Sequence, residues 1–133
     1  MNKKTVNRRF EGDAVESEAV GFLQSEGVKI LRKNYFCKTG EIDIVGTMKA
    51  PDIINPGIMT DVLIFFEVKY RKSQAADTAE AAVDLKKQKN ICRVSDHYRM
   101  VNHIPEDTPV RFDVIAVNDK YISWYENAFE YVL

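Results

Sequence analysis

Residues 62–66, Val-Leu-Ile-Phe-Phe, constrain the fold of this chain more than any other segment. A short apolar run without polar interruption predicts a strand covered on both faces, because a strand with one face in water would alternate apolar and polar residues. We therefore expect residues 61–70 to form a central strand of a sheet that has helices on both sides. Glu67 and Lys69 follow the run directly and would share one face of that strand.

The segments around this strand complete an α/β pattern. Helices are expected at residues 13–26, which Gly27 would end, and at residues 78–100, where Asp77 and Glu80 form a variant of the capping box. Further strands are expected at residues 28–36, 41–45 and 111–117, with residues 121–125 as a candidate edge strand. This order predicts an α/β fold in which a mixed β-sheet is flanked by helices.

The length of 133 residues predicts a single domain over residues 1–133. Residues 1–11 are expected to be a flexible arm, because they show no apolar periodicity. Residues 47–61 are expected to be a long loop, because Pro51, Pro56 and Gly57 interrupt any regular pattern there.

Composition excludes several classes of protein. The sequence has no run of about 18 apolar residues that could cross a membrane, and the basic residues 1–9 lack the apolar stretch of a signal peptide. Cys37 and Cys92 have neither the number nor the spacing of a disulfide framework or a cysteine-rich zinc site. We therefore expect a cytoplasmic protein with reduced thiols.

Charged side chains on faces that should be buried are the most informative residues. Glu16 lies within the apolar arc of the first predicted helix, where it would either pair with a buried Arg or Lys or complete a metal site. Asp43 and Glu67 lie on two strands that would bring their carboxylates together if the strands pair. A hard divalent cation such as Mg²⁺ relieves the repulsion of two such carboxylates, and Lys69 would then point at the same site to assist an attacking water. The alternative is an ordinary cross-strand ion pair between a lysine and Asp43 or Glu67.

Positive charges gather in three stretches, at residues 29–38, 69–72 and 86–93. Such clusters suit a phosphate-binding face, and a solvated surface of mixed charge is the alternative. Lys87 falls within the apolar arc of the long predicted helix. It therefore either lays its aliphatic stem along the apolar surface or contacts phosphate beside the acidic site.

Two strand motifs, Gly40-Glu41-Ile42-Asp43 and Glu67-Val68-Lys69-Tyr70-Arg71, resemble those of the YraN-like bacterial proteins of the restriction-endonuclease-like superfamily. Archaeal Holliday junction resolvases are more distant relatives of that family. The resemblance covers roughly residues 12–118. It includes Glu16 on the first helix, Lys87-Gln88-Lys89 on the long helix and Arg111-Phe112-Asp113 on a late strand.

The resemblance implies a metal-dependent DNA endonuclease that hydrolyses phosphodiester bonds, with branched DNA or repair intermediates as candidate substrates. Asp43 and Glu67 would bind Mg²⁺ or Mn²⁺, and Glu16 and Lys69 would complete the catalytic set. The expected contacts with DNA are made by Lys33, Arg71, Lys87 and Gln88.

Two other functions remain open on the sequence. One is a non-catalytic nucleic-acid-binding module that retains the nuclease fold, and the other is a structural protein whose buried charges are all paired. The intact set of Asp43, Glu67 and Lys69 favours the enzyme, because a protein that only binds need not keep all three. Cleavage of two strands would suit a symmetric homodimer.

Overall fold

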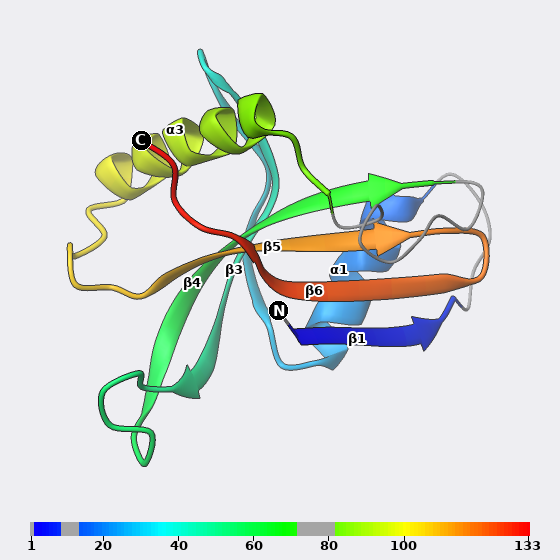
Figure 1. Cartoon of the computed structure of the whole chain (residues 1–133), viewed down its shortest axis with the longest axis horizontal. Helices are drawn as coiled ribbons and strands as arrows, with labels where there is room; N and C mark the ends of the chain where they lie inside the picture. The colour runs from blue at the N-terminus through cyan, green and yellow to red at the C-terminus, as the bar shows by residue number, and fades with distance from the viewer. Residues whose placement is uncertain (1, 9–13, 72–81) are drawn as a thin grey trace.

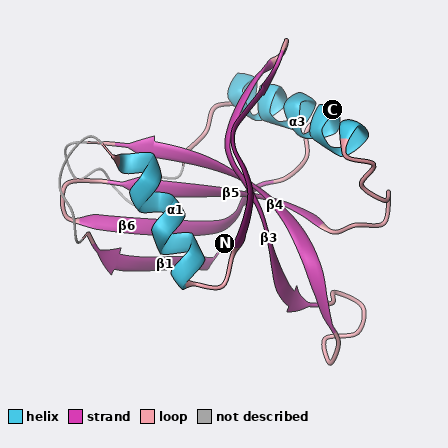
Figure 2. Ribbon diagram, turned by 180° about the vertical axis from the view of Figure 1, so that it is seen from behind, coloured by secondary structure: helices cyan, strands magenta, loops and turns pink. Residues whose placement is uncertain are grey.

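The computed structural model describes residues 2–8, 14–71 and 82–133. A six-stranded sheet with the strand order β1-β6-β5-β4-β3-β2 lies between two helices, and one strand pair within it is parallel (Figures 1 and 2). The elements follow the chain in the order β1 (Asn2–Asn7), α1 (Val15–Ser25), β2 (Lys29–Cys37), β3 (Gly40–Pro51), β4 (Met59–Tyr70), α3 (Leu85–Val101), β5 (Val110–Val117) and β6 (Tyr121–Phe129). This is the predicted α/β architecture, and it is consistent with a restriction-endonuclease-like fold.

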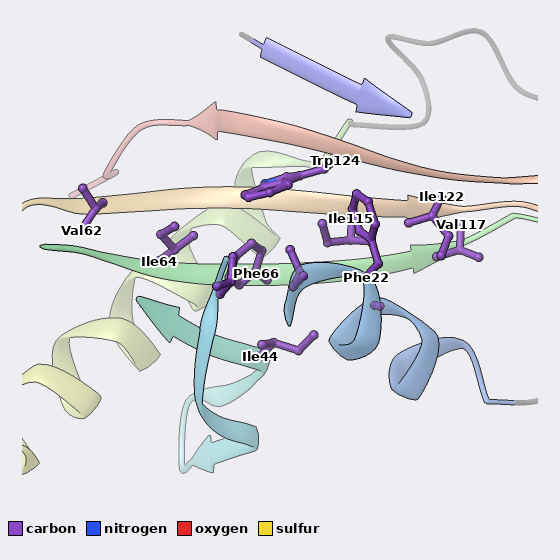
Figure 3. Close-up of a cluster of buried hydrophobic side chains, with 12 residues drawn as sticks. Phe22, Ile44, Val62, Ile64, Phe66, Ile115, Val117, Ile122 and Trp124 are labelled. Atoms are coloured by element: carbon purple, nitrogen blue, oxygen red, sulfur yellow. The ribbon is translucent and has the colours of Figure 1, made fainter. Parts of the chain in front are cut away.

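Strand β4 is the central strand that the apolar run predicts. It pairs antiparallel with β3 and parallel with β5, and the chain returns to start β5 through α3 because a parallel pair needs a crossover connection. Ile64 and Phe66 pack on the side of α1, in the cluster that also contains Trp124 (Figure 3). Leu63 and Phe65 pack on the opposite side with residues of α3. Both faces of β4 are therefore covered.

Two glycines shape the connection from helix α1 into strand β2. Gly27 ends α1 with a φ of +95°, a left-handed conformation that costs glycine little. At Gly46 on β3, an added Cβ would lie 2.7 Å from Cγ1 of Val28. Any side chain at residue 46 would therefore push the start of β2 away from β3.

The N-terminal residues correct the prediction of a flexible arm over residues 1–11. Residues 2–7 form β1, which pairs antiparallel with β6, while residues 1 and 9–11 lie outside the described residues. Strand β1 is exposed along most of its length, so its sequence lacks the apolar alternation that signals a strand. The same pairing means that β6, which extends to Phe129, is not the edge strand that we expected.

The predicted long loop at residues 47–61 is wrong. Strand β3 continues to Pro51 and β4 begins at Met59, so only residues 52–58 connect the two strands of a hairpin. The Asp52 carboxylate holds this connection by accepting hydrogen bonds from the backbone N–H groups of Ile54 (2.8 Å) and Asn55 (3.0 Å). Pro51 is tolerated because β2 pairs with β3 only as far as Thr47, so β3 is an edge strand at Pro51.

The long helix begins later than predicted. Helix α3 starts at Leu85, and the Asp84 side chain caps it by accepting a hydrogen bond from the backbone N–H of Lys87 at 2.8 Å. The expected capping residues Asp77 and Glu80 lie outside the described residues. Residues 82–84 are described and are not helical, so the effective cap is the aspartate next to the helix. No helix in the described part of the chain is long and apolar enough to cross a membrane.

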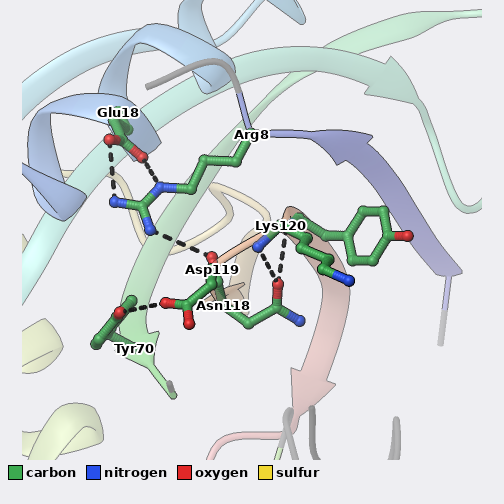
Figure 4. Close-up of polar contacts among 7 residues, drawn as sticks. Arg8, Glu18, Tyr70, Asn118, Asp119 and Lys120 are labelled. Carbon is green, nitrogen blue, oxygen red and sulfur yellow. Dashed lines mark hydrogen bonds and ion pairs between the residues drawn. The ribbon is translucent and has the colours of Figure 1, made fainter. Parts of the chain in front are cut away.

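Arg8 fastens the end of β1 to the rest of the molecule (Figure 4). Its guanidinium forms two hydrogen bonds with the Glu18 carboxylate of α1, at 2.6 and 3.1 Å, and donates another to the Asn118 carbonyl at 3.3 Å. The same guanidinium lies over the ring of Tyr70, and the Tyr70 hydroxyl donates to Asp119 at 2.6 Å. Both Arg8 and Glu18 are almost fully buried, so this is an ion pair removed from water.

Candidate active site

The candidate site lies where β3 and β4 separate, which we call the strand fork (Figure 1). The ladder between the two strands ends at the pair Ile44–Phe66. Beyond that pair, the backbone N–H of Val68 donates to Oδ2 of Asp43 at 2.7 Å. A carboxylate therefore takes the place that a strand carbonyl would occupy if the ladder continued, and this contact fixes Asp43 at the fork.

Glu67 lies beside Asp43 on the side of the sheet covered by α3. Its side chain is 14% exposed, and Oε2 lies 3.7 Å from Nζ of Lys87. Burial raises the pKa of Glu67 to about 7, and the Asp43 carboxylate contributes to the rise through its charge and a side-chain hydrogen bond. The positive charge of Lys87 opposes that rise but does not cancel it. The two carboxylates that the sequence predicted to converge are thus close neighbours.

Glu16 approaches the same point from helix α1. Its Oε1 atom is buried and has no hydrogen-bond partner. Burial raises the pKa of Glu16 above its usual value, and the nearby Asp43 carboxylate raises it further. Asp43 therefore stands between two other carboxylates, one from α1 and one from β4.

Lys69 lies two residues beyond Glu67 on β4, and its Nζ donates a hydrogen bond to the carbonyl of Ala82, just before α3. Burial lowers the pKa of Lys69, and the positive charge of Arg71 lowers it further, whereas Glu67 acts in the opposite direction. An ammonium whose pKa is lowered gives up a proton more readily than a lysine in water, as a group that handles a proton requires.

The basic residues expected to contact DNA differ in their availability. Lys33 and Arg71 are exposed, and Lys33 lies close enough to Glu16 to affect its pKa. Lys87 is about half exposed beside Glu67. Gln88 instead donates its side-chain amide to the Val83 carbonyl at 2.8 Å, which supports the start of α3. Lys33, Arg71 and Lys87 therefore present positive charge to solvent, whereas Gln88 has a structural contact.

Asn34 is a site residue that the sequence analysis did not identify. Its neighbours Lys33 and Tyr35 pair with Ile44 and Ile42, which places Asn34 opposite Asp43. Asn34 has a φ of +52°, a left-handed conformation that is uncommon outside glycine, and its side chain hydrogen-bonds Glu16. The available signal was an asparagine inside a predicted strand, since asparagine tolerates this conformation better than other residues.

The chemistry of these donors fits a hard cation better than a soft one. Asp43 and Glu67 supply carboxylate oxygens, and Mg²⁺ is commonly held by one or two carboxylates while it keeps several waters. Glu16 adds a third carboxylate near Asp43, and its Oε1 is buried without a partner. Within residues 2–8, 14–71 and 82–133, however, no group of three or more His, Cys, Asp or Glu is placed to hold a metal. The residues therefore fit a cation with mostly water ligands and do not form a closed protein cage.

Two hollows on the surface lie away from these carboxylates. One, of about 450 Å³, is lined by Cys37, His97 and neighbouring residues, and the other, of about 380 Å³, is lined by Phe112, Phe129 and others. Neither contains Asp43 or Glu67. The position of the acidic site is therefore defined by the separation of β3 and β4 and by the charges of its residues.

The fold and the site define an α/β protein with a mixed sheet and a cluster of acidic residues at a strand fork. The chain belongs to the uncharacterised protein family UPF0102, whose family model matches residues 15–117. This confirms the predicted relationship with the YraN-like proteins.

Relatives in the same family match over nearly their whole length. A UPF0102 protein of Alkaliphilus oremlandii is 42% identical over 134 residues, covering 97% of this chain and all of that protein. UPF0102 proteins of Clostridioides difficile and Lachnoclostridium phytofermentans are 40% and 37% identical, covering 93% and 94% of this chain and 100% and 97% of their own lengths. The names of these relatives state the family and no activity.

Proposed function

We propose that this protein is a Mg²⁺- or Mn²⁺-dependent DNA endonuclease of the restriction-endonuclease-like superfamily. One observation carries the proposal: the fold holds Asp43 and Glu67 together at the strand fork and raises the pKa of Glu67 to about 7. Such an arrangement costs stability unless something positive binds there. Carboxylates kept together at that cost are typical of a metal-binding catalytic site.

Each residue of the site has a role that its position supports. Asp43 and Glu67 would hold the cation, which when bound would polarise a phosphate and lower the pKa of a coordinated water. Lys69, whose pKa is lowered by burial, would orient or deprotonate the attacking water. Glu16 adds negative charge from α1, and Lys87 keeps the Glu67 side chain oriented through their ion pair.

The exposed positive charges beside the site support a polyanionic substrate. Lys33 is exposed on β2 and lies near Glu16, and Arg71 is exposed just after β4 and lies near Lys69. Phosphate contacts of this kind release counterions, so affinity for DNA should fall steeply as salt rises. Lys87→Ala should weaken binding to about the same degree for every DNA sequence.

The decisive experiment is single-turnover digestion of linear, nicked, flap and four-way-junction DNA, with protein in excess and with Mg²⁺, Mn²⁺ or Ca²⁺. We expect cleavage with Mg²⁺ or Mn²⁺ and none with Ca²⁺, whose larger and looser oxygen shell positions phosphate less well. Glu67→Ala should abolish both metal binding and cleavage. Lys69→Ala should lower cleavage at least roughly 100-fold and leave metal binding in place, because an ammonium cannot bind Mg²⁺.

The hairpin between β3 and β4 offers matched controls. Lys49 and Asp61 form an exposed ion pair there, at 2.9 Å, so Lys49→Ala and Asp61→Ala remove the same kinds of charge far from the fork. Both controls should cut as well as the unaltered protein. If the unaltered protein binds DNA and cuts none of it, the non-catalytic binding module replaces the enzyme. If Glu67→Ala and Lys69→Ala still cut, the activity arises elsewhere.

A further inference from the structure

Strand β2 forms one edge of the sheet, and its outer side has no strand partner in the described part of the chain. Most of its side chains are exposed, including Lys29, Arg32 and Lys33. Phe36 is the unusual member, because 74% of this large aromatic residue is exposed to solvent. The ring therefore contributes little to the core, and the fold does not explain its presence.

The geometry of β2 opposes pairing with another strand. Its register with β3 shifts between Ile30 and Arg32, and the φ of +52° at Asn34 interrupts the extended backbone again. Lys29, Arg32 and Lys33 add positive charge along the strand. Bulges and charged side chains, lysine above all, are the features by which proteins keep a sheet edge from pairing. A second copy of this chain is therefore a poor occupant for the β2 edge.

The charge of this edge favours a polyanion. Residues 27–40 contain Lys29, Arg32, Lys33 and Lys38 and no Asp or Glu. An unbroken basic stretch of this kind complements the phosphate backbone of a nucleic acid. The Arg32 guanidinium is also held over the ring of Tyr35, at 5.2 Å from the ring centroid, which orients one of these charges on the strand.

Phe36 lies beside the acidic site. It is paired with Glu41, two residues before Asp43 on β3, so Phe36 and Glu41 share a face of the sheet. Glu41 and Lys33 are both close enough to Glu16 to affect it. A strand of nucleic acid that follows the basic edge toward the carboxylates would therefore pass the exposed ring.

We propose that the β2 edge binds DNA that carries unpaired nucleotides, with a base stacked on Phe36 next to the acidic site. An aromatic side chain can stack on any base, but only where that base is not stacked within a duplex. The inference rests on the proposed function and specifies its substrate class: flaps, single strands and branch points in preference to continuous duplex.

The test is binding of flap, single-stranded and blunt duplex DNA by the full chain in EDTA, where no cleavage can occur. Phe36→Ala should weaken flap and single-strand binding about tenfold, within the range for loss of one stacked base, and leave blunt duplex binding unchanged. Phe36→Trp should retain binding, because it keeps an aromatic face. A 2-aminopurine base at the flap junction should be quenched by the unaltered protein and by Phe36→Trp, and should remain bright with Phe36→Ala.

Tyr121→Ala is the matched control, since it removes an aromatic ring that is 37% exposed on β6, four strands away from β2. It should leave binding of all three DNAs unchanged. Equal weakening of flap and duplex binding by Phe36→Ala, or no weakening at all, would overturn the proposal. A different oligomeric state of Phe36→Ala from that of the unaltered protein, measured by sedimentation, would also overturn it, because the β2 edge would then be a protein interface. If flap binding depends on Phe36 but the protein cuts nothing, the nuclease proposal fails and this inference stands.

Discussion

Asp113 and the carboxylates of the strand fork differ in the hydrogen bonds that the fold supplies to them. Asp113 on β5 is fully buried, and each of its oxygens accepts two hydrogen bonds of 2.8–2.9 Å, from Arg111, from Trp124 Nε1 and from the backbone N–H of Asn127. The carboxylates at the strand fork repel one another, and Oε1 of Glu16 has no partner.

We propose that this difference separates structural charges from functional ones. A carboxylate whose hydrogen bonds are all made within the fold holds elements together and has little capacity left for a ligand. A carboxylate that the fold leaves without a partner, or holds beside another carboxylate, lowers stability, and such a cost is typical of a residue that binds something. Asp113 belongs to the first kind. At the fork, Oε1 of Glu16 has no partner, and Asp43 and Glu67 each have one contact but lie beside another carboxylate.

Asp113→Ala should have the largest effect on stability. It leaves Arg111 and Trp124 without their acceptor in a buried region, and breaking a buried ion pair in this way costs about 3–5 kcal/mol. Urea denaturation measures the change in the free energy of unfolding. Asp113→Asn keeps the shape of the side chain, so its free energy of unfolding should lie between those of the unaltered protein and Asp113→Ala. An unchanged midpoint in Asp113→Ala would mean that Asp113 is not a structural charge.

Arg8→Met should cost about 3 kcal/mol, because it leaves the buried Glu18 carboxylate without its partner. The control is Lys4→Met, which breaks the ion pair between Lys4 on β1 and Glu26, the C-cap residue of α1. The Lys4 side chain is 56% exposed. Surface pairs contribute about 0–1 kcal/mol, so the control should be nearly neutral. Thermal melting in the same buffer compares the two, and equal losses would mean that burial of Arg8 does not decide its contribution.

The metal-free protein should become more stable as the pH falls from 8 to 5. The pKa of Glu67 is about 7 in the folded protein, against an ordinary value of 4.5. The folded state therefore binds the proton more tightly, so this stabilisation is complete below pH 4.5 and is lost as the pH rises through 7. The change should be roughly 2 kcal/mol, and Glu67→Gln should abolish most of it. Urea titrations of the unaltered protein and of Glu67→Gln at a series of pH values measure the change. The prediction would be contradicted if the unaltered protein became more stable as the pH rises and Glu67→Gln did not.

Asp43→Asn should have the smallest effect on stability and the opposite sign. Its amide oxygen can still accept the hydrogen bond from Val68, while the negative charge beside Glu67 and Glu16 is removed. We expect the metal-free protein to be as stable as before or about 1 kcal/mol more stable. Differential scanning calorimetry gives the answer, and an unfolded Asp43→Asn protein would make Asp43 a structural residue like Asp113.

The sequence predicted the parts of the structure that depend on local pattern. The apolar run of β4 identified the central strand. The charged residues that follow it led to the prediction that the Asp43 and Glu67 carboxylates lie close together. Helix α1 was also predicted, because its apolar periodicity and the glycine after it are both local signals.

The features that the sequence did not reveal depend on distant partners. Strand β1 has a polar sequence and exists through pairing with β6, for example between Thr5 and Ser123. The extension of β3 past Met48 depends on pairing with β4, which overrides the local effect of Pro51. The left-handed backbone of Asn34 had one local signal, the asparagine itself, but its interaction with Glu16 joins two elements that are distant in the sequence.

The pairing of β1 with β6 also sets an order of events during synthesis. Thr5 and Ser123, which touch in the folded protein, are 118 positions apart in the chain. Strand β1 emerges from the ribosome before β6, and it has no partner until β6 has been made. Closing so long a loop is slow, so β1 should dock late, after the sheet from β2 to β5 has formed. Until then, Arg8 cannot be fixed by Asn118 and Lys120, and the nascent protein holds its acidic site on an incomplete sheet.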